Sequence, residues 1–382
     1  REILPAIPWR QWLKGKAYVI TGVRRAGKST LLREIKQNLI AECGAAKENF
    51  IHINFFDDRL SFLPDRLGLL LEAYFGLYPD KRRAEKIYFL LDELQEIDGW
   101  EAFVDRILRT ENCAVIISGS TAKLLTQDAS RQMRGRSLSW ELYPFSFSEF
   151  YRLKNRKVLD LLSPEGRGKA TRCFDMYWEA GGFPEASLLE PSLRVKLHQE
   201  YFATILARDI SERTNTRNPR AVQWIARRLL QDTACHFSTN QLVKELKNEG
   251  FPATKAFVNK VLAAAEDAYL FFPVYLNSPS LRKRMANTRK IYCIDSALVR
   301  SVRSSHFVNE GLLFENLVYI ELRRRGFEVF YHRTKSGREV DFCFRDQKTG
   351  EITLLQAAYS LKEPATRERE IQGLLEAEAE LK

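Results

Sequence analysis

The sequence predicts an α/β protein whose first 145 residues form a parallel sheet flanked by helices. Short apolar segments alternate with amphipathic ones over this stretch. A glycine-rich turn joins the first apolar segment to the first helix, and a later apolar segment ends in two acids. This rhythm is typical of parallel sheets, because each return crossover is usually made by a helix.

Five apolar segments are the expected strands, at residues 17–21, 50–54, 87–91, 114–118 and 138–142. A helix is expected over residues 30–40, directly after the glycine-rich turn. Its apolar residues recur at helical spacing, and they are Leu31, Leu32, Ile35 and Leu39. Ligands of parallel sheets bind at the carboxyl ends of the strands, so the turn after the first strand is the expected ligand site.

The turn itself reads Gly22-Val23-Arg24-Arg25-Ala26-Gly27-Lys28-Ser29, with Thr30 following. It fits the phosphate-loop pattern G-x-x-x-x-G-K-[ST] at every fixed position. The glycines let backbone N–H groups converge on a polyphosphate, Lys28 reaches the β and γ oxygens, and the Ser29 hydroxyl can ligate Mg²⁺. A nucleotide site is predicted here, in preference to a chance glycine-rich turn.

A second polar signal ends the third expected strand, where an apolar run leads into Asp92 and Glu93. In phosphate-loop hydrolases one such carboxylate enters the Mg²⁺ shell and another orients the attacking water. We assign Asp92 to magnesium and Glu93 to water activation; buried-strand acids at a solvated exit are the alternative. The fourth strand ends in Ser118-Gly119-Ser120. Ser118 is a candidate for sensing the γ-phosphate, or part of a plain turn.

Composition places the chain among ordinary globular proteins. Its 382 residues suffice for two or three domains. No apolar stretch approaches a membrane span, and no signal-like segment heads the chain. The six cysteines form no CxxC pair and the five histidines no cluster. We therefore expect a cytoplasmic protein with reduced cysteines, no membrane association and no zinc site.

The positive charge is unevenly placed. The whole chain carries a net charge of +11, and residues 151–310 contain 26 Lys and Arg against 16 Asp and Glu, which accounts for +10. A middle region of this kind favours a polyanion partner such as DNA. A solvated basic helical region is the alternative.

Helical periodicity dominates from residue 146 to about residue 230. A turn-rich break is expected at residues 162–168, and a sharper turn at Gly181-Gly182-Phe183-Pro184-Glu185. Two glycines before Phe-Pro end a helix abruptly. Such a turn can lay backbone against a flat ring such as adenine.

Residues 218–276 and the following ribbon predict a winged helix. Helices are expected at 239–248 and about 254–267, then a strand at 269–276, a turn at 277–280 and a returning strand at 290–294. The second helix would enter a major groove, and a basic wing loop would follow phosphates. The loop's expected cations are Arg282, Lys283, Arg284, Arg289 and Lys290. Winged helices also contact proteins, which is the alternative.

The last 72 residues, 311–382, predict a helix over 312–325 and strands at 327–332, 339–345 and 352–356. Glu315 and Asp341 occupy positions at which restriction-type nucleases place metal-binding acids. Those sites also need an acid-x-Lys on the next strand, and that lysine position holds Ala358. Nuclease activity is therefore not expected.

The ordered motifs resemble one family along nearly the whole chain. They are similar to prokaryotic AAA-type (archaeal-ATPase-like) P-loop ATPases that carry a C-terminal, restriction-endonuclease-like domain of unknown function 4143. The matching segments are residues 21–30, 91–100, 118–120, 134–136, 181–185, 208–210 and 333–342.

The resemblance implies an AAA-type ATPase core at 1–145, a helical lid at 146–217, a winged helix at 218–310 and a restriction-endonuclease-like α/β domain at 311–382. It implies ATP as ligand, Mg²⁺ as cofactor and a homo-oligomer, in which Arg134 or Arg136 would complete a neighbouring site. Gly182 and Pro184 would lie near the adenine. The chain starts at Arg1 and stops at Lys382, so we expect both ends to be trimmed and the last domain to be truncated or degenerate.

Three functions are consistent with these observations. The first is ATP hydrolysis by a DNA-associated AAA-type protein. The second is a nucleotide-gated switch that contacts proteins through the winged helix and tail. The third is an ATP-dependent nuclease, which Ala358 opposes.

Overall fold

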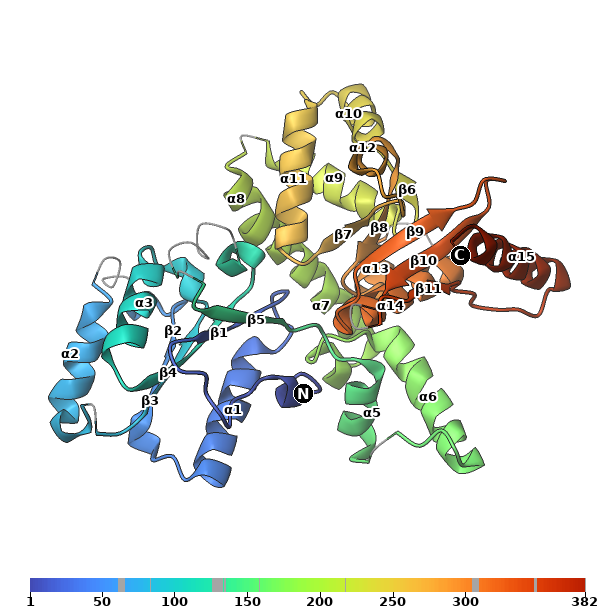
Figure 1. The fold of residues 1–382 in the computed structure, drawn as a ribbon. Coiled ribbons are helices and arrows are strands. Elements are labelled where there is room, and N and C mark those ends of the chain that lie inside the picture. Colours follow the sequence, from blue (N-terminus) through green and yellow to red (C-terminus); the bar gives the residue numbers. More distant parts are fainter. Residues whose placement is uncertain are drawn as a thin grey trace. The chain divides into compact units, whose positions relative to one another are not determined.

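The computed structural model describes residues 1–60, 66–82, 84–125, 133, 135–157, 159–216, 218–303, 309–346 and 349–381. The chain divides into two compact units, Arg1–Tyr143 and Pro144–Lys382 (Figure 1). Within the described ranges, no helix is both long and apolar enough to cross a membrane.

The first unit is built on a five-stranded sheet. Its strands are β1 (Ala17–Thr21), β2 (Phe50–Asn54), β3 (Ile87–Asp92), β4 (Cys113–Gly119) and β5 (Ser137–Glu141). They lie in the order β2-β3-β4-β1-β5, and every neighbouring pair is parallel. All five predicted strands are confirmed, with ends that differ by at most one residue.

Helices cover both faces of this sheet, as Figure 1 shows for α1 (Lys28–Cys43), α2 (Gly68–Leu77) and α3 (Trp100–Thr110). Because side chains alternate along a strand, β1 sends Tyr18 and Ile20 to one face and Val19 to the other. The first face packs on α1, and the opposite face packs on α3. Burial on both sides explains why the strands read as continuous apolar runs.

The second unit begins with helices. They are α5 (Phe147–Asn155), α6 (Pro164–Ala180), α7 (Pro191–Thr204), α8 (Glu212–Thr214) and α9 (Pro219–Gln231), with a π-helical segment, Ile205–Ser211, between α7 and α8. Side-chain caps fix where several of them start. Ser146 forms a capping box with Glu149 at the start of α5, and Ser163 caps α6. The predicted helical region is thereby confirmed as helical.

A small antiparallel sheet follows. Its order is β6-β8-β7, formed by β6 (His236–Phe237), β7 (Phe271–Val274) and β8 (Arg289–Cys293). Helices α10 (Thr239–Asn248) and α11 (Lys255–Asp267) lie between β6 and β7 in the chain and pack together, capped by Ser238 and Thr254. The segment between β7 and β8 was predicted to be a wing loop, but part of it is helical. Ser280 caps a short helix there, α12 (Leu281–Ala286), so Arg282, Lys283 and Arg284 lie on a helical turn. The other two predicted wing cations, Arg289 and Lys290, lie on β8.

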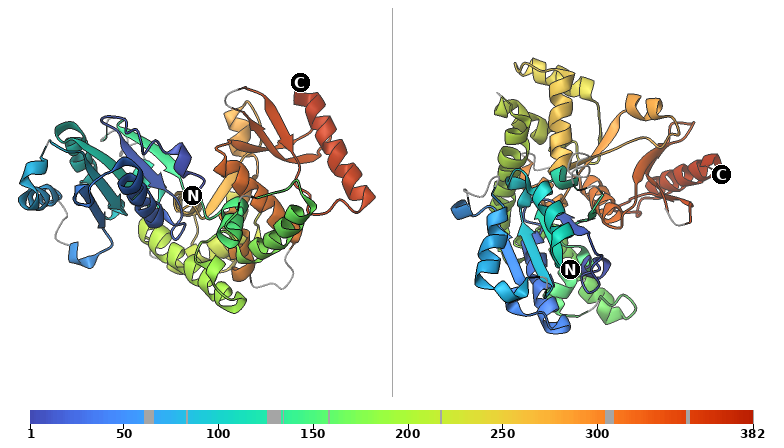
Figure 2. Two further views of the ribbon diagram at one scale, coloured as in Figure 1. Left: turned by 90° about the horizontal axis from the view of Figure 1, so that it is seen from below. Right: turned by 60° about the vertical axis from the view of Figure 1, so that its left-hand side comes forward.

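The remaining residues form α13 (Ser296–Val302), α14 (Glu310–Arg324), a second antiparallel sheet and α15 (Pro364–Leu381). The sheet has the order β11-β10-β9, from β9 (Val329–Arg333), β10 (Glu339–Arg345) and β11 (Ile352–Leu355). Its edge strand β9 is bonded to the chain that leaves β7. Tyr331 donates its N–H to Tyr275, and Asn277 donates its N–H to Tyr331. The two small sheets are therefore joined through backbone hydrogen bonds, and Figure 2 shows them in two further views.

Candidate functional site

The glycine-rich turn of the first unit closes between β1 and α1. Gly22 has φ +148°, and a Cβ on it would lie 2.1 Å from the carbonyl oxygen of Leu142. Gly27 (φ +102°) is the N-cap residue of α1 and Arg25 also has a positive φ, +70°. Only glycine fits the Gly22 position, because L side chains rarely adopt such a φ and the space is filled by backbone. The turn delivers the chain to a helix N-terminus, where N–H groups and the helix dipole favour anions.

Lys28, the first residue of α1, is buried, with 4% of its surface exposed. Its Nζ donates to the carbonyl oxygens of Gly22 at 3.0 Å and Val23 at 3.1 Å. The same Nζ lies 3.7 Å from Glu93 Oε1. The ammonium thus folds back over its own loop, held mainly by neutral acceptors.

Asp92 ends β3 and is 1% exposed. Its Oδ1 accepts a hydrogen bond from the Ser118 hydroxyl, and its Oδ2 accepts one from Asn54 Nδ2 at 3.4 Å. Both partners are neutral donors that fix the orientation of the side chain, and its carboxylate oxygens are hard ligands of the kind Mg²⁺ prefers. Ser118 and Asn54 come from β4 and β2, the two strands that flank β3.

Glu93 follows directly, in a left-handed conformation with φ +55°. One of its oxygens, Oε2, accepts from Gln95 Nε2 at 2.6 Å and from the N–H of Ser120 at 3.0 Å. Burial alone would raise the pKa of Glu93, but the charge of Lys28, these hydrogen bonds and the charge of Arg24 outweigh it and lower the pKa below its ordinary value. Glu93 is therefore an ionised carboxylate with one anchored oxygen and one oxygen facing Lys28.

Gln95 and Asn54 are site residues that the sequence reasoning missed. Gln95 belongs to a motif that supported the family resemblance, yet no role was predicted for it. Its position two residues after Glu93, and that of Asn54 at the end of the neighbouring strand, are signals that could have found them. Side chains at the carboxyl ends of adjacent parallel strands meet at one edge of the sheet.

Ser118, the candidate for sensing the γ-phosphate, lies beside Asp92 and Glu93. It is fully buried; its hydroxyl donates to Asp92 and accepts from the N–H of Glu93 at 3.3 Å. In this arrangement it orients the two acids. Its contact with a γ-phosphate stays a prediction, as do those of Arg24, Arg25, Ala26, Ser29 and Thr30 with a nucleotide.

Of the two arginine candidates, only Arg136 is described, directly before β5. Arg134 is outside the described residues. Arg136 has a partner in its own unit, because its Nε lies 3.5 Å from Asp105 Oδ1, and Arg109 lies 3.0 Å from the other oxygen of that buried carboxylate. A role for Arg136 in a neighbouring subunit requires this pair to open.

Gly182 and Pro184 lie in the second unit, at the end of α6. The Gly182 N–H donates to Asp295 Oδ2 at 2.7 Å, and its carbonyl oxygen accepts from the N–H of Phe145 at 2.6 Å. A Cβ at Gly182 would meet the Phe145 carbonyl oxygen at 2.6 Å. This glycine is thus needed for close backbone packing. Its predicted contact with adenine is not tested by these bonds and stays a prediction.

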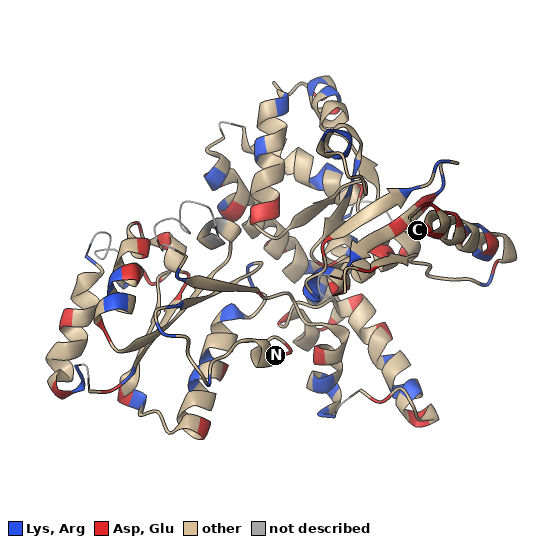
Figure 3. Ribbon diagram, in the orientation of Figure 1, with Lys and Arg blue, Asp and Glu red and all other residues tan. Residues whose placement is uncertain are grey.

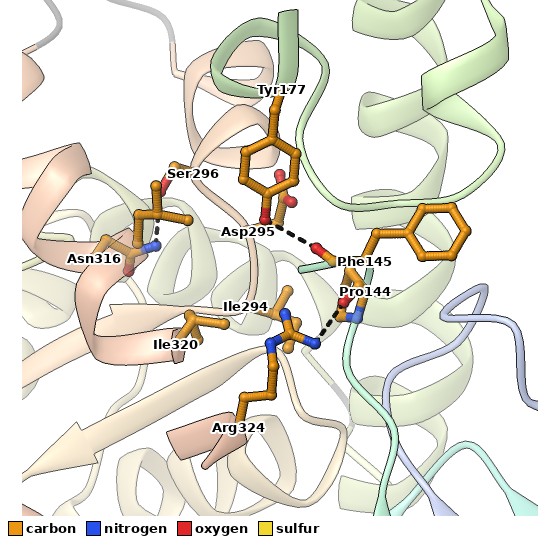
Figure 4. A pocket seen from close by; sticks show the side chains of 10 residues that line it. Pro144, Phe145, Tyr177, Ile294, Asp295, Ser296, Asn316, Ile320 and Arg324 are labelled. Atoms are coloured by element: carbon orange, nitrogen blue, oxygen red, sulfur yellow. Dashed lines mark hydrogen bonds between the residues drawn. The ribbon is translucent and has the colours of Figure 1, made fainter. Parts of the chain in front are cut away.

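A pocket of the second unit lies beside this turn (Figure 4). Its polar groups already have partners: Tyr177 donates to the carbonyl oxygen of Phe145 at 2.9 Å, and Arg324 donates to that of Pro144 at 2.9 Å. Asn316 Nδ2 donates to the Ser296 hydroxyl at 3.1 Å. These bonds hold the chain where the second unit begins, so the pocket is structural in character.

The five predicted wing cations separate into two groups. Arg282 and Lys283 are exposed on α12. Arg284 donates to the carbonyl oxygen of Ser278 at 2.5 Å, Arg289 donates to Thr239 at 2.8 Å, and Lys290 is only 3% exposed. The prediction that all five follow phosphates is therefore wrong for Lys290, which is buried among acids, and Arg284 and Arg289 are engaged within the fold.

Lys290 lies at the centre of a carboxylate cluster. Its Nζ is 2.6 Å from Glu315 Oε1, 3.0 Å from Glu339 Oε1 and 3.1 Å from Asp341 Oδ1. Burial would lower the pKa of Lys290, but the three carboxylates outweigh it and hold that pKa above its ordinary value. In the described part of the chain, no group of three or more His, Cys, Asp or Glu side chains is arranged to hold a metal ion.

Comparison with known proteins places this chain in a family. The uncharacterized protein MJ1544 of Methanocaldococcus jannaschii is 32% identical over 377 residues, which cover 97% of this chain and 80% of that protein. The chain belongs to the MJ1544 family. An uncharacterized protein of Haemophilus influenzae is 28% identical over 347 residues, covering 90% of this chain and 83% of the other.

Two domain models match this MJ1544-family chain. Residues 14–151 match a family described as an AAA domain, and residues 171–306 match a domain of unknown function, DUF8612. The first unit is thus an AAA domain with the phosphate loop of P-loop ATPases. Among solved structures, the Walker-type ATPase PABY2304 of Pyrococcus abyssi is similar with a TM-score of 0.46 and 16% identity, covering 75% of this chain and 91% of that one.

Proposed function

We propose that this chain binds ATP with Mg²⁺, hydrolyses it in the AAA domain, and associates with DNA through residues 218–310. The observation that carries the first part is the convergence of Lys28 and Glu93 at 3.7 Å beside the phosphate loop. One cation for the phosphates and one carboxylate for the water are the two charges that phosphoryl transfer to water requires.

Lys28 supplies the movable charge. It is held by the carbonyl oxygens of Gly22 and Val23, which are neutral acceptors. A triphosphate offers charged oxygens, and hydrogen bonds to charged acceptors are about twice as strong as those to neutral ones. Binding would therefore draw the ammonium from its own loop onto the β and γ oxygens.

Ser29 and Asp92 would hold the metal. Ser29 is the second residue of α1, and Asp92 is oriented by Ser118 and Asn54. When bound, Mg²⁺ neutralises charge on the phosphoryl oxygens. The donor set fits this ion, since a hydroxyl and a carboxylate are both hard oxygen ligands.

Glu93 would orient the attacking water. Its Oε2 is fixed by Gln95 and the Ser120 N–H, so Oε1 is the oxygen left to face the reacting group. The lowered pKa keeps this carboxylate ionised and able to accept a proton from water. A role for Arg134 or Arg136 of a neighbouring subunit, and adenine contacts of Gly182 and Pro184, remain further parts of the proposal.

The DNA part of the proposal rests on exposed charge. Helices α10, α11 and α12 with the sheet β6-β8-β7 give the outline of a winged helix, in which α12 stands in for the wing loop. Figure 3 shows Lys and Arg recurring along these helices. The exposed cations are Lys244, Lys247, Lys255, Lys260, Arg282 and Lys283. Such cations suit the sequence-independent binding of phosphates.

The ATPase proposal is tested with Glu93→Gln. This change keeps the shape of the side chain but removes the charge that activates water. We expect turnover to fall on the order of 10²–10⁴-fold while ATP binding persists. Hydrolysis at the wild-type rate would remove Glu93 from the mechanism, and a mass measurement with ATP bound would show whether the chain self-assembles.

The DNA proposal is tested with Arg282→Glu/Lys283→Glu. Binding to duplex, single-stranded and branched DNA is titrated over a series of salt concentrations, alongside ATPase rates with each DNA. We expect weaker binding and a salt slope shallower by about one for each lost phosphate contact. The matched control, Lys335→Glu/Lys362→Glu, makes the same charge change at exposed tail residues. Equal effects of the two variants would contradict a specific role for α12.

A second candidate function has one specific observation in its favour. Leu281 and Met285 are 70% and 65% exposed on α12. Paired apolar side chains on a surface helix suit a protein partner. A nucleotide-gated switch that binds protein through α12 would show slow hydrolysis that no DNA stimulates.

A further inference from the structure

The carboxylates around Lys290 come from distant parts of the second unit. Glu315 lies on α14, Glu339 and Asp341 lie on β10, and Lys290 itself lies on β8 of the other small sheet. All four side chains meet with Nζ–O distances between 2.6 and 3.1 Å. A single ammonium is therefore the centre toward which three acids from two elements point.

Other groups complete the surroundings of the cluster. The Tyr292 hydroxyl donates to Glu315 Oε1 at 2.6 Å, and His236 Nε2 lies 2.6 Å from Glu339 Oε2. The backbone N–H of Ala357 donates to Asp341 Oδ2 at 3.1 Å. Each carboxylate thus has an oxygen on Lys290 and a further hydrogen bond of its own, so the acids are held in place as a built site.

Three converging carboxylate oxygens are the usual surroundings of a divalent cation rather than of a lysine. Sequence reasoning expected a metal-dependent centre at Glu315 and Asp341 to need a lysine at position 358, where Ala358 stands. The structure supplies a lysine from a different strand. It places the ammonium between the three acids, so that a cation already occupies the centre on which their oxygens converge.

We infer that Lys290 is a built-in cation that occupies the carboxylate centre of the tail, excludes a divalent metal from it, and fastens strand β8 to α14 and β10. The centre is therefore closed to metal-dependent chemistry. Its role is positioning: β8 begins three residues after α12, so the cluster fixes the strand that carries this basic helix.

The fastening has a simple electrostatic reason. Removing the ammonium leaves three buried or partly buried carboxylates without a cation, and like charges at this distance repel. A divalent ion supplied from solution is the smallest group that would restore the charge. This inference does not depend on ATP hydrolysis or on DNA binding.

The test is hydrogen exchange of the full chain, read on peptides covering β8 and β10, for wild type, Lys290→Met and Lys290→Met/Asp341→Asn. Methionine is an unbranched side chain one atom shorter than lysine, and it removes the charge together with the hydrogen-bond donors of the ammonium. We expect at least tenfold faster exchange in Lys290→Met without metal. Millimolar Mn²⁺ should restore slow exchange in that variant, leave wild type unchanged, and fail to act on the double variant.

Three results would overturn the inference. Wild-type exchange in Lys290→Met would show that Lys290 fastens nothing. Fast exchange in Lys290→Met that Mn²⁺ does not slow would show that the ammonium of Lys290 does not occupy a cation site. Manganese-dependent protection of these strands in wild type would show that the centre is open to metal. Should Lys290→Met fold only poorly, its recovery on refolding with and without Mn²⁺ serves as the measurement, and recovery independent of Mn²⁺ contradicts the inference.

Discussion

Two buried lysines, one in each unit, stand beside carboxylates and are held in opposite ways. Lys28 donates to two backbone carbonyl oxygens, and Glu93 Oε1 lies 3.7 Å from its Nζ. Lys290 has three carboxylate oxygens between 2.6 and 3.1 Å. The hydrogen bonds of Lys28 to carbonyl oxygens can be exchanged for stronger bonds to a charged ligand. The ammonium of Lys290 already has charged acceptors, so a ligand offers it no such gain. The difference separates a site that receives a ligand from a site that is already filled.

The largest expected effect comes from removing each lysine and measuring ATP turnover. Lys28→Ala should lower turnover on the order of 10²–10³-fold, because a preorganised positive charge at the transferring phosphate is lost. Lys290→Met should keep turnover close to wild type, since its cluster lies in the other unit. Equal losses in the two variants would break the comparison.

The second effect concerns stability, and here the larger loss is expected at Lys290, not at Lys28. Lys290→Met should lower the free energy of unfolding by about 3–5 kcal/mol, because breaking a buried ion pair leaves uncompensated charge. Urea unfolding of the full chain measures this loss. Lys290→Arg, which keeps the charge, is the control and should lose less. A stability equal to wild type in Lys290→Met would mean that the acids find other partners.

A smaller effect is expected at Gln95, whose amide holds Glu93 at 2.6 Å. Gln95→Ala should lower turnover about tenfold with little change in the KM for ATP, because a hydrogen bond to a charged group is worth about 1.5–3 kcal/mol. Asp98→Ala, at an exposed residue of the same turn, is the matched control. Rates that fall equally in both variants would point to a general disturbance of this turn.

The smallest expected effect is on the rate at which a thiol reagent labels Cys293, which lies on the same strand as Lys290. Burial raises the pKa of the Cys293 thiol to about 12, so little thiolate is available near neutral pH. In wild type a thiol reagent should label exposed Cys43 first and leave Cys293 unmodified. Faster labelling of Cys293 in Lys290→Met, with Cys113 of the first unit unchanged, would sharpen the link between the cluster and β8.

The sequence predicted what depends on neighbours along the chain. The strands at 17–21 and 50–54 were predicted at their observed bounds, because continuous apolar runs and a glycine-rich turn are local signals. Asp92 and Glu93 were found in the same way. The hydrogen bonds that Ser118 and Gln95 make to these acids were not predicted, because they depend on how neighbouring strands place their ends.

What the sequence could not predict depends on contacts between distant elements. Lys290 looked like one more basic residue of a wing, while its partner Asp341 lies 51 residues further on. Leu281–Ala286 was predicted as loop although Ser280 caps it as a helix, because six residues give too little periodicity to reveal a helix. Neither the burial of Lys290 among acids nor the short helix α12 can be recognised from a single stretch of sequence.

The close approach of Gly22 to Leu142 has a mechanical consequence. The N–H of Leu142 donates to the carbonyl oxygen of Thr21 at 2.7 Å, so the residue that enters the phosphate loop is tied to the residue two before Pro144. The backbone of Leu142 already fills the space that a Cβ at Gly22 would occupy, so the loop cannot move toward Leu142 without displacing it. A displacement of the loop at Gly22 would therefore press on the backbone of Leu142, two residues before Pro144, where the second unit begins.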